Sequence, residues 1–203
     1  RGLQVQQSEC QGRLRLWREF QRLTIGSESG MERDFFALFD LPRRFLVDGG
    51  ELDRRFRDIQ SRVHPDKHAH LPESDRRAAM QWATLANEAY RSLKNPLLRA
   101  RHLLNLAGCD VATETNTAMS PEFLVEQMTW RESVADAKTS GDLDGLEEIL
   151  GAVKGRAEQE YLELQNDLDI RHDYAAAAER VRRLMFQEKL LDEINDAIEA
   201  TEA

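Results

Sequence analysis

Four residues within one short stretch, His64, Asp66, His68 and His70, have the side chains best suited to chemistry. Imidazole and carboxylate groups bind metal ions and transfer protons, so this stretch could form a metal site or an acid–base pair. The spacing argues against both. The histidines lack the helical i, i+4 placement of HExxH, no nucleophile motif is evident, and Pro65 separates His64 from Asp66. We therefore expect no metal site, no cofactor and no catalytic residue.

The cysteines and the net charge exclude further classes of function. Cys10 and Cys109 belong to no CxxC pair, so neither a disulfide framework nor a thiolate zinc site is expected. The net charge of −9 argues against nucleic acid as the main partner, because binding phosphate groups requires a cationic surface. No run approaches the roughly 18 apolar residues of a membrane-spanning helix, and no apolar signal core is evident. We expect no membrane partner and a location in the cytosol or an equivalent compartment.

The composition predicts an all-α protein. Leu and Ala are abundant, the 203 residues include only 11 Gly and 5 Pro, and 32% of them are charged. The apolar fraction of 41% is enough to bury a core. Residues 1–30 form a segment apart that ends just before Met31, and we expect it to be a leader or an upstream sequence that packs little.

Two helices must hold the tripeptide His64-Pro65-Asp66. Apolar residues at spacings of four, three and four predict the first helix, whose buried face carries Leu52, Phe56, Ile59 and Val63. Pro65 disfavours the helical conformation of the residue before it, so this helix should end near His64. A second stripe ends near Asn95-Pro96 and consists of Trp82, Leu85, Ala86, Ala89 and Leu93. The tripeptide is therefore expected in the loop of a helical hairpin, which a short helix over 35–39 precedes.

In this setting the chain resembles the J domain of the DnaJ family. The resemblance rests on the aromatic opening at 34–39, the Arg-rich helix at 51–63, the His-Pro-Asp loop, and Asn87-Glu88-Ala89-Tyr90 in the helix that follows. It implies that the loop and the adjoining helix dock on an ATP-bound heat-shock chaperone and promote ATP hydrolysis by that partner. The residues expected to bind the chaperone are His64, Pro65, Asp66, Lys67, Arg54, Arg55, Arg57 and Arg62.

The arginines of the first hairpin helix would form a cationic face. At about 100° per residue, Arg54 and Arg57 lie opposite the apolar stripe, while Arg55 and Arg62 lie on one flank. Together with Lys67 they would present positive charge to an acidic partner surface. The alternative is a solvated cationic face without a partner.

A second domain follows the hairpin. A helix over 97–108 should end at Gly108, and residues 109–119 form a predicted linker. The tripeptide Ser120-Pro121-Glu122 then offers an N-cap, a proline and an acid in the first turn, which predicts the start of a new helix. Two later apolar stripes are Leu143, Leu146, Leu150, Val153, Ala157, Tyr161, Leu164 and Leu168, then Val181, Leu184, Leu191, Ile194 and Ile198. We expect an antiparallel three-helix bundle over 120–203, after a J domain over 31–108.

The first bundle helix has two apolar faces. Phe123, Trp130, Val134 and Ala137 form a stripe that can face the core of the bundle. On the same helix Leu124, Val125 and Met128 point away from this stripe, and Glu132 and Asp136 lie near the same outer side. On the last helix Phe186 falls about 200° from Leu184, so it also lies off the core stripe. Exposed apolar clusters with an acidic rim often mark partner sites, and their truncation should cost the fold little. The alternative is that Leu124 and Val125 pack against the J domain or a loop.

The segment NPLLRARHLL at 95–104 is similar to the junction of HscB-type J-domain co-chaperones, and the Gly/Phe-rich stretch and zinc domain of ordinary DnaJ proteins are absent. This resemblance implies an L-shaped, two-domain adaptor for iron–sulfur cluster assembly, which delivers the scaffold IscU to an HscA-type ATPase. The implied client-binding residues are Leu124, Val125, Met128, Glu132, Asp136 and Phe186. Thr129 departs from relatives that carry a glutamate there. The implied location is the bacterial cytoplasm, or the mitochondrial matrix for a eukaryotic source, and the alternative is a general protein-folding J protein with another client.

Overall fold

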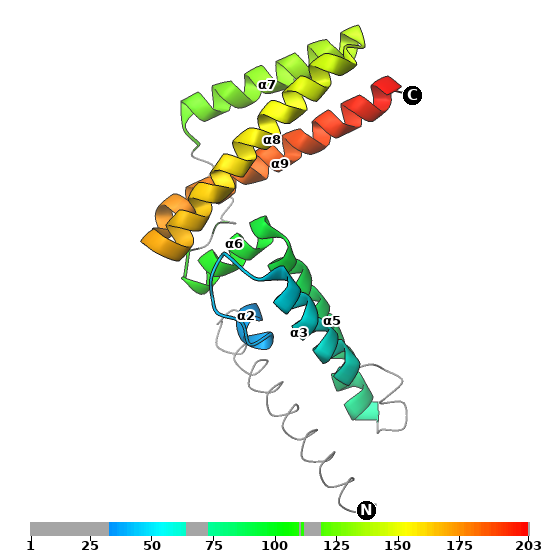
Figure 1. Cartoon of the computed structure of the whole chain (residues 1–203), viewed down its shortest axis with the longest axis vertical. Helices are drawn as coiled ribbons and strands as arrows, with labels where there is room; N and C mark the ends of the chain where they lie inside the picture. Colours follow the sequence, from blue (N-terminus) through cyan, green and yellow to red (C-terminus); the bar gives the residue numbers. More distant parts are fainter. Residues whose placement is uncertain (1–32, 64–72, 110, 112–118, 203) are drawn as a thin grey trace, which may run out of the picture. The chain divides into compact units, whose positions relative to one another are not determined.

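The computed structural model describes residues 33–63, 73–109, 111 and 119–202. All regular elements in these ranges are helices, which confirms the all-α prediction (Figure 1). In chain order they are α2 (Phe35–Leu38), α3 (Gly49–Val63), α5 (Glu73–Lys94), α6 (Pro96–Leu106), α7 (Pro121–Ser140), α8 (Leu143–Gln165), the π-helical turn η2 (Asn166–Arg171) and α9 (Tyr174–Glu202). Within the part of the chain described, no helix combines the length and apolar character needed to cross a membrane.

The chain divides into two compact units. The first unit consists of the described residues up to Arg43 and of Val47–Arg99. The second unit takes the short segment Arg44–Leu46 and everything from Ala100 onwards. The division therefore falls within α6.

The first unit is built on the antiparallel pair α3 and α5 (Figure 1). Gln60 near the end of α3 donates to Asn87 over 2.7 Å, whereas Asp53 near its start binds Lys94 at the end of α5 over 2.7 Å. These two contacts run in opposite order along the two helices. The buried side of α5 consists of Ala78, Trp82, Leu85, Ala86, Ala89 and Leu93. The predicted hairpin is therefore confirmed.

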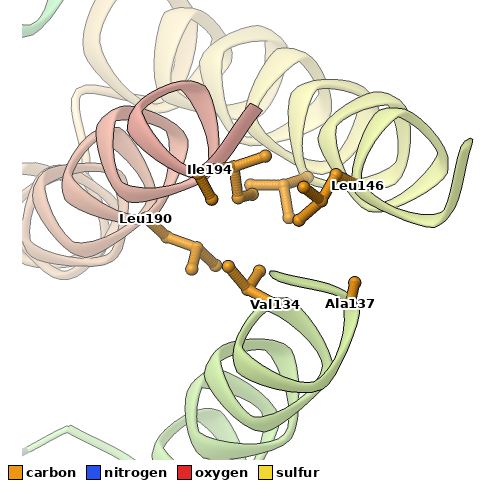
Figure 2. Packing of buried hydrophobic residues seen from close by; sticks show 7 residues of the cluster. Val134, Ala137, Leu146, Leu190 and Ile194 are labelled. Atoms are coloured by element: carbon orange, nitrogen blue, oxygen red, sulfur yellow. The ribbon is translucent and has the colours of Figure 1, made fainter. Parts of the chain in front are cut away.

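The second unit contains the bundle of α7, α8 and α9 (Figure 1). The Oγ atom of Ser120 accepts a hydrogen bond from the Phe123 amide, and Pro121 opens α7, as the sequence predicted. Gly141 ends this helix in the left-handed conformation at φ 67°, where glycine carries no steric cost. The core cluster consists of Val134, Ala137, Leu146, Val153, Leu190, Ile194 and Ala197, five of which are labelled in Figure 2.

The end of α8 differs from the sequence expectation. The apolar spacing predicted an α-helix continuing to Leu168, but the coil widens to a π-helical turn over Asn166–Arg171. This turn buries Asp167 as well as Leu168, at 1% and 5% exposure. The Asp167 carboxylate accepts hydrogen bonds from Arg171 at 2.8 Å and from Arg180 on α9 at 2.7 Å. A buried carboxylate needs such partners, so the ionic contact with α9 accompanies the change in helix type.

The same turn holds a distant piece of chain. The two carboxylate oxygens of Asp169 accept hydrogen bonds from the backbone amides of Phe45 and Leu46, at 2.6 and 2.9 Å. Phe45 is 6% exposed. These contacts explain why Arg44–Leu46 belongs to the second unit although it precedes α3 in the sequence.

Candidate functional site

The start of α3 is fixed by Asp48. Its Oδ1 atom accepts hydrogen bonds from the amides of Gly50 and Glu51, at 2.8 and 3.1 Å, which satisfies two free donors of the first turn. The helix then buries Leu52 and Val63, at 1% and 8% exposure. Because Val63 is its last residue, α3 leads directly into the predicted His-Pro-Asp loop.

A polar and aromatic contact sets the register of α3 against α5. The Asp53 carboxylate accepts hydrogen bonds from the Lys94 ammonium at 2.7 Å and from the Tyr90 hydroxyl at 2.9 Å. These two hydrogen bonds hold the pKa of Asp53 below its ordinary value, and the bond from Lys94 has the larger effect. One turn further, Phe56 stacks on the Tyr90 ring with the centroids 4.1 Å apart. Tyr90, one of the residues that carried the J-domain resemblance, therefore helps to hold α3 against α5.

Two of the α3 arginines are partly neutralised within the unit. The Nε atom of Arg54 donates to Glu51 at 2.9 Å, and the Nε atom of Arg55 donates to the same carboxylate at 2.7 Å. Arg55 also reaches Asp40 at 3.0 Å. Hydrogen bonds from both arginines lower the pKa of Glu51, and the bond from Arg54 has the larger effect. The charge that these two arginines can offer a partner is accordingly reduced.

Arg57 and Arg62 are both exposed at the surface of α3. For Arg57, no hydrogen bond or ion pair occurs within the described residues, although its charge contributes to the low pKa of Asp53. Among the arginines predicted to bind the chaperone, Arg57 thus has a charge that its own unit offsets little.

The His-Pro-Asp loop lies outside the described residues, as do Lys67, His68 and His70. Elsewhere in the described chain, no group of three or more His, Cys, Asp or Glu side chains could hold a metal ion.

The first bundle helix α7 buries one face and exposes the other. Phe123, Val134 and Ala137 are buried at 6%, 8% and 8% exposure, and Trp130 is half-buried, so the predicted core stripe is confirmed. The opposite side carries the residues predicted to bind the client, Leu124, Val125, Met128, Glu132 and Asp136, which we call the outer α7 face. Its three apolar side chains are 43%, 63% and 61% exposed, and both acids are exposed.

Phe186 on α9 was predicted to lie off the core stripe, and the structure places it half-buried. Its ring packs edge-on against Phe123 of α7, with the centroids 6.1 Å apart. The guanidinium of Arg183 lies over the other ring of this pair, 5.9 Å from the Phe123 centroid. Phe186 therefore lies beside α7 and contacts it at the buried stripe.

Sequence reasoning missed two buried residues that are sequence neighbours of predicted client-binding residues. Gln127 and Gln187 are buried at 4% and 2% exposure, and each adjoins a predicted client-binding residue, Met128 or Phe186. The signal was present for Gln127, because it lies four residues after Phe123 and seven before Val134, on the buried stripe of α7. A glutamine at such a position does not count as apolar in a periodicity analysis.

Comparisons with known proteins agree with this architecture. The family model described as the HSCB C-terminal oligomerisation domain matches residues 119–195. A co-chaperone protein HscB homolog of Aromatoleum aromaticum is 51% identical over 172 residues, which cover 85% of this chain and 97% of the relative. The corresponding protein of Ralstonia nicotianae is 51% identical over 164 residues, with 81% and 93% covered.

Solved structures show the same likeness. The chaperone HscB from Vibrio cholerae is 35% identical with a TM-score of 0.74, and the match covers 83% of this chain and 99% of that one. The human co-chaperone protein HscB is 28% identical with a TM-score of 0.75, over 80% and 81% of the two chains. Fold and sequence together define a co-chaperone. The chain belongs to the HscB family of co-chaperones.

Proposed function

We propose that this co-chaperone serves iron–sulfur cluster assembly by stimulating ATP hydrolysis in an HscA-type chaperone and delivering the scaffold IscU to it. The observation that carries the proposal is the outer α7 face, where three apolar side chains stay exposed in a chain of the HscB family. Soluble proteins rarely expose adjacent large apolar side chains unless a partner covers them.

The chaperone-binding end is proposed to be α3 with the loop that follows it. Pro65 restricts its own backbone, while the side chains of His64 and Asp66 can form hydrogen bonds with a partner. Arg57 adds a cationic group that no ion pair within the described chain offsets. These residues bind and orient the partner, so the catalytic groups for ATP hydrolysis belong to the chaperone.

The client-binding end is proposed to be the outer α7 face together with Phe186. Leu124, Val125 and Met128 would lose contact with water when the scaffold docks, and this burial supplies the main driving force. Glu132 and Asp136 lie at the rim, where charge mainly affects the rate and the specificity of association. A fitting partner surface is therefore apolar at its centre and cationic at its edge.

The decisive experiment measures ATP hydrolysis by a purified HscA-type chaperone with this chain, with the scaffold, and with both. We expect stimulation by the chain alone and a larger stimulation with the scaffold. His64→Gln and Asp66→Asn should abolish both effects without changing the helical content. Undiminished stimulation by these variants would contradict the chaperone-binding assignment.

The scaffold arm separates this proposal from a general protein-folding role. A general co-chaperone would stimulate equally with an unfolded model protein, whereas a dedicated one should respond to the scaffold alone. The bacterial relatives support a location in the bacterial cytoplasm, where both partners would be available.

A further inference from the structure

Two glutamines interrupt the buried stripes of α7 and α9. Gln127 on α7 is 4% exposed, and Gln187 on α9 is 2% exposed. The side-chain oxygen Oε1 of each is buried and has no hydrogen-bond partner within the described part of the chain. A buried carbonyl oxygen without a partner destabilises a fold, so two of them in neighbouring helices require an explanation.

Both glutamines occupy positions where the helical pattern calls for an apolar side chain. Gln127 lies on the stripe that buries Phe123 and Val134. Gln187 lies three residues after Leu184 and three before Leu190, and both leucines are fully buried. An apolar residue at either position would continue the core and remove the cost of burying an amide. The pattern indicates that α7 and α9 pack less tightly than they would with apolar residues at positions 127 and 187.

The other packing contacts of α7 lie on either side of Gln127. Before it, Phe123 packs edge-on against Phe186 of α9. After it, Val134 and Ala137 belong to the buried core cluster (Figure 2), and the half-buried Trp130 packs against that cluster. Arg131 donates to Glu193 on α9 at 3.1 Å, but the two side chains are 39% and 49% exposed. An ion pair as exposed as this one stabilises a fold little.

The proposed client surface lies across this same pair of helices. Its apolar centre combines Leu124, Val125 and Met128 on α7 with Phe186 on α9. Gln127 precedes Met128 directly, and Gln187 follows Phe186 directly. The shape of the surface therefore depends on how α7 is placed against α9. Gln127 lies between Phe123 and Arg131, which both contact α9, and Gln187 follows Phe186, which contacts α7.

We propose that Gln127 and Gln187 are positioning residues for client binding, which keep the contact between α7 and α9 adjustable. The helix α7 then shifts against α9 as the client covers Met128 and Phe186. This inference rests on the proposed function, because it assigns a role behind the client surface. Apolar side chains at both positions would tighten the contact, fix the surface in its free arrangement and weaken client binding while stabilising the fold.

The test compares the full-length wild-type chain with Gln127→Met/Gln187→Met. Gln159→Met is the matched control, because Gln159 is exposed on α8. We expect the double variant to melt about 5 °C higher, since it removes two buried unpaired oxygens. Hydrogen exchange of the α7 amides should slow, while exchange in α8 stays unchanged. Calorimetric titration with purified IscU should show affinity at least about fivefold weaker, and the control should bind as the wild type does.

Two results would overturn the inference. A lower melting temperature of the double variant would show that the amides are paired in solution and stabilise the bundle. A higher melting temperature with unchanged scaffold affinity would show that the glutamines affect helix pairing alone. Failure of the wild-type chain to bind the scaffold would instead contradict the proposed function, and the exchange rates of α7 would still decide whether the glutamines loosen this helix.

Discussion

Phe186 on α9 packs edge-on against Phe123 on α7, with the ring planes inclined at 73°. Phe123 is buried and Phe186 is half-buried, so this pair connects the proposed client surface to the core of the bundle. The sequence suggested that all apolar residues of that surface could be truncated at little cost to the fold. For Phe186 the contact with Phe123 argues otherwise.

Replacing Phe186 by Ala should therefore reduce both stability and client binding. The change removes a half-buried ring and an aromatic contact, which we expect to lower the free energy of unfolding by about 2 kcal/mol. Urea denaturation measures this loss. Phe186→Leu keeps much of the apolar area and serves as the comparison, with a smaller loss expected. An unchanged unfolding free energy in the alanine variant would show that the ring contact contributes nothing to the bundle.

The exposed residues of α7 allow a cleaner test of the client surface. Leu124→Ala/Val125→Ala/Met128→Ala removes side chains that are 43%, 63% and 61% exposed, so the melting temperature should change little. Scaffold affinity should fall on the order of a hundredfold, because truncating residues at the centre of an interface typically costs about 2 kcal/mol or more each without full additivity.

The control for this variant is Leu162→Ala on α8, since Leu162 is 65% exposed and lies outside the proposed surface. It should bind the scaffold as the wild-type chain does in calorimetric titration. If the control and the triple variant lost affinity equally, the binding site would not be the outer α7 face.

The structure ranks the α3 arginines for chaperone docking. Arg57→Gln removes a charge without an ion pair in the described chain, whereas Arg54→Gln removes one that Glu51 already offsets. We expect the first variant to weaken ATPase stimulation about two- to fivefold at low salt, with a smaller loss for the second, because exposed charges contribute modestly. The loss should shrink as added salt screens the charges. The control is Lys154→Gln, which changes the net charge by the same amount at an exposed position of α8. Equal losses of stimulation for the Arg54 and Arg57 variants would contradict the ranking.

Much of the fold could be predicted from periodicity and capping residues. Ser120 and Pro121 predicted the start of α7, and Gly108 predicted the end of α6, where it adopts a positive φ of 77°. The π-helical turn at Asn166–Arg171 could not be predicted, because its apolar residues also fit an α-helix. The contact between Asp167 and Arg180 that accompanies this turn links residues 13 positions apart, which no local pattern records.

The candidate site was predictable to a similar extent. The two faces of α7 followed from helical angles, because residues that share a face of one helix can be identified from their spacing alone. The partial burial of Phe186 and the pairing of Arg54 and Arg55 with Glu51 depend on which neighbours come close. Gln127 was missed because a polar side chain at a core position is visible only once the burial is known.

The contact between Asp53 and Lys94 should appear as a shifted titration. Because Lys94 and Tyr90 lower the pKa of Asp53, the carboxyl should titrate below the ordinary midpoint of about 3.9. The stability that this contact gives the α3–α5 pair is present above that ordinary value, and it is lost as the pH falls through the lowered pKa. Carbon-detected NMR of the side-chain carboxyl measures the midpoint. Lys94→Met should raise it more than Tyr90→Phe, because Lys94 is the larger cause, and an ordinary midpoint in the wild type would contradict the contact.

The last prediction concerns Arg180, which joins two buried acids at the end of the bundle. It donates to Asp167 at 2.7 Å and to Glu160 at 2.8 Å, and the two carboxylate side chains are only 2% and 8% exposed. Arg180→Met keeps most of the side-chain length but leaves both buried carboxylates with less compensation. Removing one partner of a buried ion pair typically costs about 3–5 kcal/mol, and we expect the lower end because Arg171 still binds Asp167.

Arg156→Met is the matched control, since Arg156 is 51% exposed and meets Glu126 at 3.9 Å. An exposed pair contributes at most about 1 kcal/mol, so this variant should unfold at nearly the wild-type urea concentration. Arg180→Met should unfold at a clearly lower concentration at neutral pH. Asp167→Asn combined with Arg180→Met should recover part of the loss, because one uncompensated charge is then removed together with its partner. Additive losses in this double variant would show that Arg180 stabilises the bundle through packing of its side chain rather than through the buried acids.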